Sequence, residues 1–142
     1  MDVFFLAVAN TINPYSLLML FFGVIGGILV GSIPGMTANM AVAIMTSLSF
    51  GMDSMTAIML LIGVYFGSMY GGSISAILLH IPGTPSAVMT AKDGYPMAQK
   101  GEAGKAIGIA TFASFSGGMI SMFLLMAAAP IISRMALKEA LI

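Results

Sequence analysis

The chain is apolar along most of its length and is interrupted twice by the same three residues, Ile33-Pro34-Gly35 and Ile81-Pro82-Gly83. Proline removes a backbone donor and glycine permits turn geometry, so a helix is expected to break at each place. In hydrocarbon, a broken backbone is tolerated only where protein buries it or where it lines a wet cavity. The two breaks therefore predict interrupted helices that meet inside the protein or border a cavity.

The composition indicates a membrane protein. Hydrophobic residues make up 59% of the 142 residues and charged residues 7%, against roughly 25% charged in a soluble domain. The mean hydropathy is +1.06. The chain has no basic run that would suit nucleic acid and no cysteine for thiolate chemistry. We predict an all-α, polytopic membrane protein of one domain over residues 1–142, with spanning helices and Pro-Gly-interrupted half-helices in a lipid bilayer.

The uncharged segments set the expected helices. Tyr15 to Ile33 would make about 28 Å of helix, and Ala106 to Pro130 is long enough for another span. Met55 to His80 would make about 39 Å, more than one crossing needs unless it tilts or unwinds, and Gly71-Gly72 is the expected place for unwinding. Thr37 to Phe50 would reach only about 21 Å, which predicts a half-helix.

Glycines recur every four residues before both breaks, at Gly23, Gly27, Gly31 and Gly35 and again at Gly63, Gly67 and Gly71. Such a face lets helix backbones approach closely, as in packing between small residues in membranes. A permeation path along this face is the alternative.

Three further segments carry expectations. Val3 to Ala9 and Ile131 to Ile142 are interpreted as interfacial helices. Lys92 to Lys105 is interpreted as a solvated loop, because it holds three lysines between glycines and a proline. Its lysines place it in the cytoplasm by the positive-inside rule.

A shift of 48 residues places the first break on the second and Gly23 on Gly71, which makes a weak internal repeat. Paired Pro/Gly interruptions are typical of discontinuous transport helices, whose free ends form the binding site. Two ordinary helix-ending turns are the alternative.

Three ordered stretches resemble the large membrane subunit of the tripartite tricarboxylate transporters: GSIPGMTANMAVAIMTSLSFG, GVYFGSMYGGSISAILLHIPGTPS and AKDGYPMAQKGEAGKAIGIA. The resemblance covers roughly residues 20 to 135. The matching positions are Pro34, Gly35, Gly67, Tyr70, Gly71, Gly72, Ser73, Pro82, Gly83, Pro85, Ser86, Asp93, Gly94, Tyr95 and Pro96. Two positions depart from the family pattern, since His80 stands where Asn is expected and Ser47 where Pro is expected.

This resemblance implies a protein several times longer, built of two related halves, of which this chain looks like the N-terminal part. It implies uptake of tricarboxylates or related organic carboxylates across the bacterial inner membrane, driven by an ion gradient with Na⁺ or H⁺ as the coupling cation. The implied partners are a small membrane subunit and a periplasmic solute-binding protein. No enzyme activity, organic cofactor or bound metal is expected.

A carboxylate needs positive potential, yet the apolar segments before Lys92 contain no lysine or arginine. Two helix N-termini can supply it through unpaired N–H groups and the helix dipole. The expected substrate-binding residues follow or adjoin the breaks: Gly35, Thr37, Asn39, Ser73, His80, Gly83, Thr84 and Ser86. The carbonyls of Ile33 and Ile81 are candidates for binding the coupling cation.

Several of these residues have simpler interpretations. Thr37 and Thr84 are expected to cap the helices that follow, and capping can be their whole role. His80, costly within a membrane, either hydrogen-bonds a neighbouring helix or contacts protons or substrate. Asp93 is interpreted as a capping or structural charge, with ion coupling as the alternative.

Two other classes of function are alternatives to transport. Gly71-Gly72-Ser73 faintly resembles the serine motif of membrane proteases. Ser73 and His80 are, however, about 10 Å apart along a helix, too far for nucleophile activation. A scaffold for a partner subunit is the remaining alternative.

Overall fold

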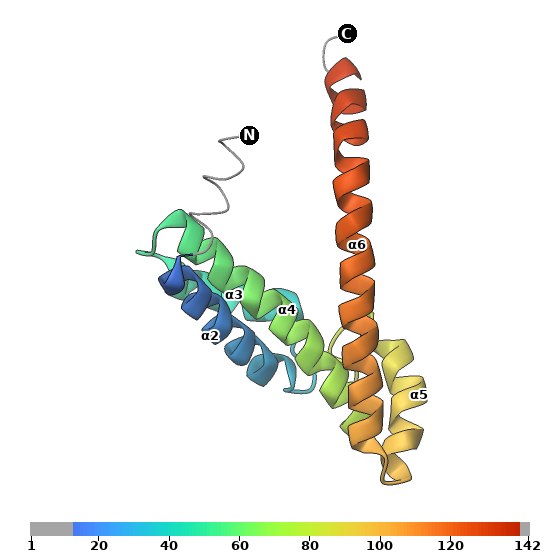
Figure 1. Cartoon of the computed structure of the whole chain (residues 1–142). Helices are drawn as coiled ribbons and strands as arrows, with labels where there is room; N and C mark the ends of the chain where they lie inside the picture. Colours follow the sequence, from blue (N-terminus) through green and yellow to red (C-terminus); the bar gives the residue numbers. More distant parts are fainter. Residues whose placement is uncertain (1–12, 140–142) are drawn as a thin grey trace. The chain divides into compact units, whose positions relative to one another are not determined.

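The structure, a computed structural model, describes the backbone of residues 13–139 and the side chains up to residue 129. This part is helical and contains no strand: α2 (Pro14–Gly31), α3 (Ala38–Ser49), α4 (Ser54–Leu79), α5 (Ala87–Gln99) and α6 (Ala103–Glu139) (Figure 1). The chain divides into two compact units, Met1–Ile107 and Gly108–Ile142, and each is described by itself. The all-α prediction is confirmed, whereas the expected helix at Val3 to Ala9 lies outside the described residues.

Side chains before each of the first three helices cap them. Asn13 accepts from the Tyr15 amide at 3.1 Å, and Thr37 accepts from the Met40 amide at 3.3 Å. Asp53 accepts from the Thr56 amide at 3.1 Å. Hydrogen bonds from the side chain and backbone of Thr56 lower the pKa of Asp53, because they favour the charged carboxylate. Local capping therefore fixes where α2, α3 and α4 begin.

Three segments within the described helices are long and apolar enough to cross a membrane: Pro14–Gly31, Ser54–Leu79 and Ala103–Ala129. Helix α3 has 12 residues, about 18 Å, and is too short to cross. The prediction of spanning helices with a half-helix between them is confirmed.

The glycine faces of α2 and α4 pack against each other. The buried hydroxyls of Ser16 and Thr56, 40 positions apart, are 3.1 Å from each other. A Cβ added to Gly27 would collide with the Val64 backbone, and one added to Gly67 would collide with Val24. Neighbours advance together along both helices, so α2 and α4 run parallel with their backbones in contact. In the described part, these glycines serve helix packing.

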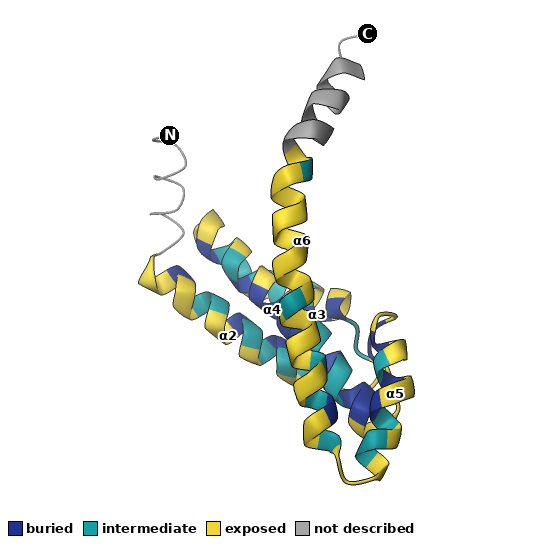
Figure 2. Cartoon of the chain, turned by 45° about the vertical axis from the view of Figure 1, so that its right-hand side comes forward, coloured by how far each residue is buried: buried dark blue, intermediate teal, exposed yellow. Residues whose placement is uncertain are grey.

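Parallel α2 and α4 require α3 to turn back between them. The Met45 side chain of α3 lies against Gly26 of α2, as expected for an antiparallel pair. Helix α4 then has 26 residues where α2 has 18, so it runs two turns past the end of α2. The expected unwinding at Gly71-Gly72 is wrong, because α4 is continuous there. Gly71 instead packs against α2, where an added Cβ would collide with the Ile28 carbonyl oxygen. Buried positions run along α4 from Thr56 to Ile77 (Figure 2).

Two expected boundaries are wrong. Helix α5 extends to Gln99, so only a short turn around Gly101 remains of the expected loop at Lys92 to Lys105. Gly94 suggested a turn, but it packs on Ile77, where an added Cβ would stand 2.7 Å from Cγ1. In the second unit, α6 continues through position 130 to Glu139, so no separate interfacial helix begins at Ile131. Proline is tolerated within membrane helices.

Candidate functional site

The two Pro-Gly breaks lie against each other. The first is the turn at residues 32–37 after α2, and the second is the segment at residues 80–86 after α4. A Cβ added to Gly83 would stand 3.1 Å from the Met36 carbonyl oxygen and 3.3 Å from the Cα of Gly72. Because α4 overshoots α2, the second segment returns along α4 to reach the first. The beginnings of α3 and α5 thereby come together.

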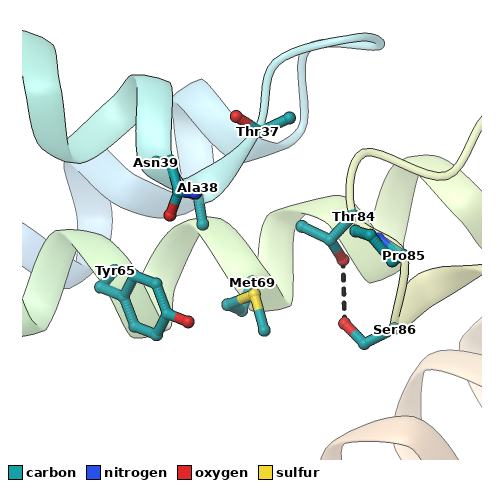
Figure 3. Close-up of a pocket in the computed structure, with 8 residues that line it drawn as sticks. All are labelled: Thr37, Ala38, Asn39, Tyr65, Met69, Thr84, Pro85 and Ser86. Atoms are coloured by element: carbon teal, nitrogen blue, oxygen red, sulfur yellow. Dashed lines mark hydrogen bonds between the residues drawn. The ribbon is translucent and has the colours of Figure 1, made fainter.

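A pocket of about 450 Å³ lies where they meet (Figure 3). This volume is in the range of small-molecule sites. Four of the expected site residues line it, namely Thr37, Asn39, Thr84 and Ser86. The remaining lining residues are Ala38, Pro85, Tyr65 and Met69. The structure thus brings together the hydroxyl and amide groups of both breaks, and their role in binding stays a prediction.

The pocket is rich in hydrogen-bond donors. The Thr84 and Ser86 hydroxyls are 3.0 Å apart, so one donates to the other and a single hydrogen is left to point elsewhere. The Thr37 oxygen accepts from the Met40 amide, which leaves its own hydrogen free to be donated. The Asn39 amide and the Tyr65 hydroxyl add further donors. This set suits a ligand that presents several acceptor oxygens.

Among the residues that the structure describes, no charged side chain lines the pocket. Backbone N–H groups are therefore the groups that can supply a positive potential there. The first turn of α3 begins at the pocket, at Ala38 and Asn39, and the first N–H groups of a helix have no acceptor within it. Such an end carries roughly half a positive charge and favours anions. The pocket therefore suits an anion without a fixed lysine or arginine.

Helix α5 begins differently from the prediction. Thr84 does not cap it with its side chain. Ser86 stands before the first helical residue, Ala87, and makes no side-chain capping hydrogen bond. The backbone carbonyls of Thr84 and Pro85 instead accept from the amides of Ala87 and Val88 at 3.0 and 3.3 Å. This turn satisfies the start of α5 with backbone, which leaves the Thr84 and Ser86 hydroxyls in the pocket.

Gly35 and Gly83 do not line the pocket but shape the breaks. Gly35 has φ +87°, a conformation that favours glycine, and an added Cβ there would meet nothing within 4 Å. At Gly35, therefore, backbone conformation and not lack of space demands glycine. At Gly83 the close approach of Met36 and Gly72 demands it.

The other expected site residues lie outside the pocket lining. The Ser73 hydroxyl donates to the Met69 carbonyl of its own helix at 3.3 Å. The Ile33 carbonyl accepts from the Met36 amide at 3.1 Å within the first break. Ile81 is exposed in the second break. Whether the two isoleucine carbonyls bind a cation stays a prediction.

His80 ends α4 in the left-handed conformation, with φ 58°, and its amide donates to the Ala76 carbonyl at 3.2 Å. Its exposed ring lies 4.5 Å from the Tyr95 ring of α5, centroid to centroid. Left-handed backbone is uncommon outside glycine and recurs at constrained sites. His80 therefore sits at the start of the segment that carries Thr84 and Ser86, with its ring against the next helix.

Tyr65 and Met69 were missing from the predicted site. Both belong to α4, four residues apart and on one face, and this spacing was the available signal. In the sequence, Tyr65 stands out only by its hydroxyl within an apolar helical segment. Their part in the pocket depends on α3 turning back beside α4.

Spanning helices, a half-helix that turns back and two breaks beside one uncharged pocket define a polytopic membrane protein built on interrupted helices. The chain belongs to the tripartite tricarboxylate transporter TctA family, whose profile matches residues 17–141. It is also 40% identical over 129 residues to an uncharacterized 52.8 kDa protein of the TAR-I ttuC′ 3′ region of Agrobacterium vitis. That match covers 91% of this chain and 26% of the relative, so the chain spans about a quarter of the relative's length. No solved structure matches the chain.

The family is one of transporter components and not of enzymes. The structure at Gly71-Gly72-Ser73, the protease-like motif, agrees with this. The Ser73 hydroxyl is bonded within its own helix, and His80 lies against Tyr95. The described residues therefore show no serine–histidine pair at this motif.

Proposed function

We propose that this chain forms part of the membrane subunit of an ion-gradient-driven secondary transporter for tricarboxylates or related organic carboxylates. One observation carries the proposal: the starts of α3 and α5, each after a Pro-Gly break, share one donor-rich, uncharged pocket. Membership of the TctA family supports the same function. Discontinuous helices whose ends face a common cavity are the typical substrate sites of secondary transporters.

In this proposal, the carboxylate oxygens accept from the Thr37 hydroxyl, the Asn39 amide and the Thr84–Ser86 pair, and the N-terminus of α3 balances the charge. An anion enters an uncharged site more readily when a cation accompanies it, which fits coupling to Na⁺ or H⁺. The backbone carbonyls of the breaks, at Ile33 and Ile81, are the proposed contacts of that cation.

The proposal includes the partners that the name of the family implies. A periplasmic solute-binding protein would deliver the carboxylate to this subunit in the bacterial inner membrane, beside a small membrane subunit. A scaffold that carries no substrate is the competing function, and no contact among the described residues favours it.

Uptake of labelled citrate by cells that produce the protein with its partner subunits tests the proposal. Thr84→Val keeps the shape of the buried Thr84 side chain and removes its hydroxyl, so the uptake KM should rise by roughly tenfold, equivalent to one lost hydrogen bond to a charged ligand. Protein in the membrane should be unchanged.

Thr46→Val is the matched control, because the Thr46 hydroxyl donates to the Val42 carbonyl of its own helix at 2.8 Å and does not line the pocket. If both variants take up citrate equally well, or if the unaltered protein takes up no carboxylate, the proposed function is wrong.

A further inference from the structure

The hydrogen-bond donors of the pocket form two groups that are separated along α4. Asn39 of α3 and Tyr65 of α4 lie on one side of Met69 (Figure 3). The hydrogen-bonded hydroxyls of Thr84 and Ser86 lie on its other side. We call Asn39 and Tyr65 the amide pole, and Thr84 and Ser86 the hydroxyl pole. A ligand that fills the pocket therefore meets donors at two separate places.

Contacts with α4 set the distance between the two poles. Thr84 packs at Gly72, since a Cβ added to Gly72 would stand 3.6 Å from the Thr84 Cγ2 atom. Tyr65 lies two helical turns before Gly72, about 10 Å along the axis. Hydrogen bonds of about 3 Å at the two ends leave roughly 4–5 Å between the two acceptor groups of a ligand that spans the pocket. A short linear dicarboxylate has this span.

Each pole also stands at the positive end of a helix. Ala38 and Asn39, the first residues of α3, line the pocket, and Ser86 stands directly before the first residue of α5. Each helix N-terminus carries roughly half a positive charge. The amides of Ala87 and Val88 are bonded within the turn before α5, so the hydroxyls are the donors at the hydroxyl pole. Two partial charges at separate places favour two separate carboxylates over one compact anion.

Met69 forms the wall between the poles. It is half-buried, lies one helical turn after Tyr65 on the same face of α4, and has no hydrogen-bond donor in its side chain. The Thr37 hydroxyl is directed away from Met69 (Figure 3). The middle of a ligand that reaches both poles therefore lies against a thioether. This surface suits methylene groups and disfavours a hydroxyl, which would lose its water without gaining a partner.

We propose that the pocket selects linear dicarboxylates that reach both poles and have an apolar middle, and that Met69 determines this specificity. One carboxylate binds at the amide pole with the first N–H groups of α3, and the other binds at the hydroxyl pole. The inference rests on the proposed function and specifies the substrate class of the same site.

Binding of glutarate, malonate and β-hydroxyglutarate to the protein in lipid nanodiscs, measured by isothermal titration calorimetry, tests the inference. All are dicarboxylates; malonate is too short to span the poles, and β-hydroxyglutarate is glutarate with a hydroxyl in the middle. Malonate should bind at least about tenfold more weakly than glutarate, because it loses the hydrogen bonds of one pole. β-Hydroxyglutarate should bind about tenfold more weakly than glutarate, because its hydroxyl lies unpaired against Met69.

Met69→Gln keeps the length of the side chain and adds an amide that can pair with the middle hydroxyl. It should therefore raise the affinity for β-hydroxyglutarate to that for glutarate or above it, a change of preference that a loss of folding cannot produce. Met59→Gln is the matched control, because Met59 is also half-buried on α4 and does not line the pocket. The control should keep the preference of the unaltered protein.

Other results overturn the inference. Malonate binding as tightly as glutarate would show that one pole holds the ligand alone. Equal affinities for glutarate and β-hydroxyglutarate, or an unchanged preference in Met69→Gln, would show that Met69 does not determine specificity. If Met69→Gln binds no ligand, the comparison of the three ligands on the unaltered protein decides. The proposed function stands in each of these cases, whereas failure of all three dicarboxylates and of citrate would overturn it together with the inference.

Discussion

Gly83 and Met36 lie 47 positions apart in the sequence, yet a Cβ added to Gly83 would stand 3.1 Å from the Met36 carbonyl oxygen. This contact joins the two Pro-Gly breaks. It holds the start of α5 beside the start of α3, and the pocket exists because of that proximity. The contact leaves room for a hydrogen atom but not for a methyl group at its ordinary distance.

Gly83→Ala should therefore separate the breaks by a few tenths of an ångström. We expect a loss of about 1–3 kcal/mol in the free energy of unfolding, typical of overpacking, and reduced citrate uptake. Thermal unfolding in detergent and uptake by intact cells measure the two effects. Unfolding and uptake like those of the unaltered protein would show that the breaks do not pack so closely.

Gly35 should respond to conformation and not to bulk. Gly35→Ala places a Cβ in open space but at φ +87°, so it should destabilise by about 1–2 kcal/mol. Gly35→Asn should cost less, because asparagine tolerates left-handed backbone. Denaturation of both variants decides the matter, and an alanine variant as stable as the asparagine variant would contradict the assigned backbone.

Two glycine substitutions should change the free energy of unfolding in opposite directions, because Gly67 lies in the close contact of α2 and α4 and Gly104 does not. Gly67→Ala places a Cβ on the Val24 carbonyl and should destabilise by about 1–3 kcal/mol. Gly104→Ala, at an exposed helical position with nothing within 4 Å, should stabilise by about 0.5–1 kcal/mol because alanine favours helix. Circular dichroism during heating measures both. A stabilising Gly67→Ala would rule out the close packing.

His80 offers a test between packing and a functional role. His80→Asn keeps the left-handed conformation accessible and removes the ring contact with Tyr95. If His80 carries protons or touches substrate, the variant should change the pH dependence or substrate range of uptake while inserting normally. Tyr95→Leu is the matched control, because it removes the same contact and keeps the imidazole. An unchanged pH profile and substrate range in His80→Asn would leave His80 as a packing residue.

The lysines near the end of α5 predict its side of the membrane. Gln99 is exposed at the end of α5, and Ser54 is exposed at the beginning of α4. The sequence contains no cysteine, so a single introduced cysteine would be the only thiol to react. Gln99→Cys should resist membrane-impermeant thiol reagents added outside the cell, whereas Ser54→Cys should react, because Lys92, Lys100 and Lys105 place their end in the cytoplasm. The reverse labelling pattern would invert the orientation.

The sequence by itself determined the features that depend on near neighbours. Low charge and long apolar runs required a membrane protein of helices, and the two Ile-Pro-Gly sequences required breaks in them. Thr37 caps α3 and Asp53 caps α4. These are local effects of hydropathy, missing amides and short hydrogen bonds, so a linear pattern contains them.

Only the tertiary structure decided which distant residues meet. A shift of 48 matched the breaks in sequence, but Ser16 and Thr56 pair at a separation of 40, because α4 is two turns longer than α2. Register depends on how closely two backbones approach over their whole length, which no single segment records. The same packing kept Gly94 helical against Ile77 and brought Tyr65 to the pocket, since both positions depend on the direction in which the chain returns.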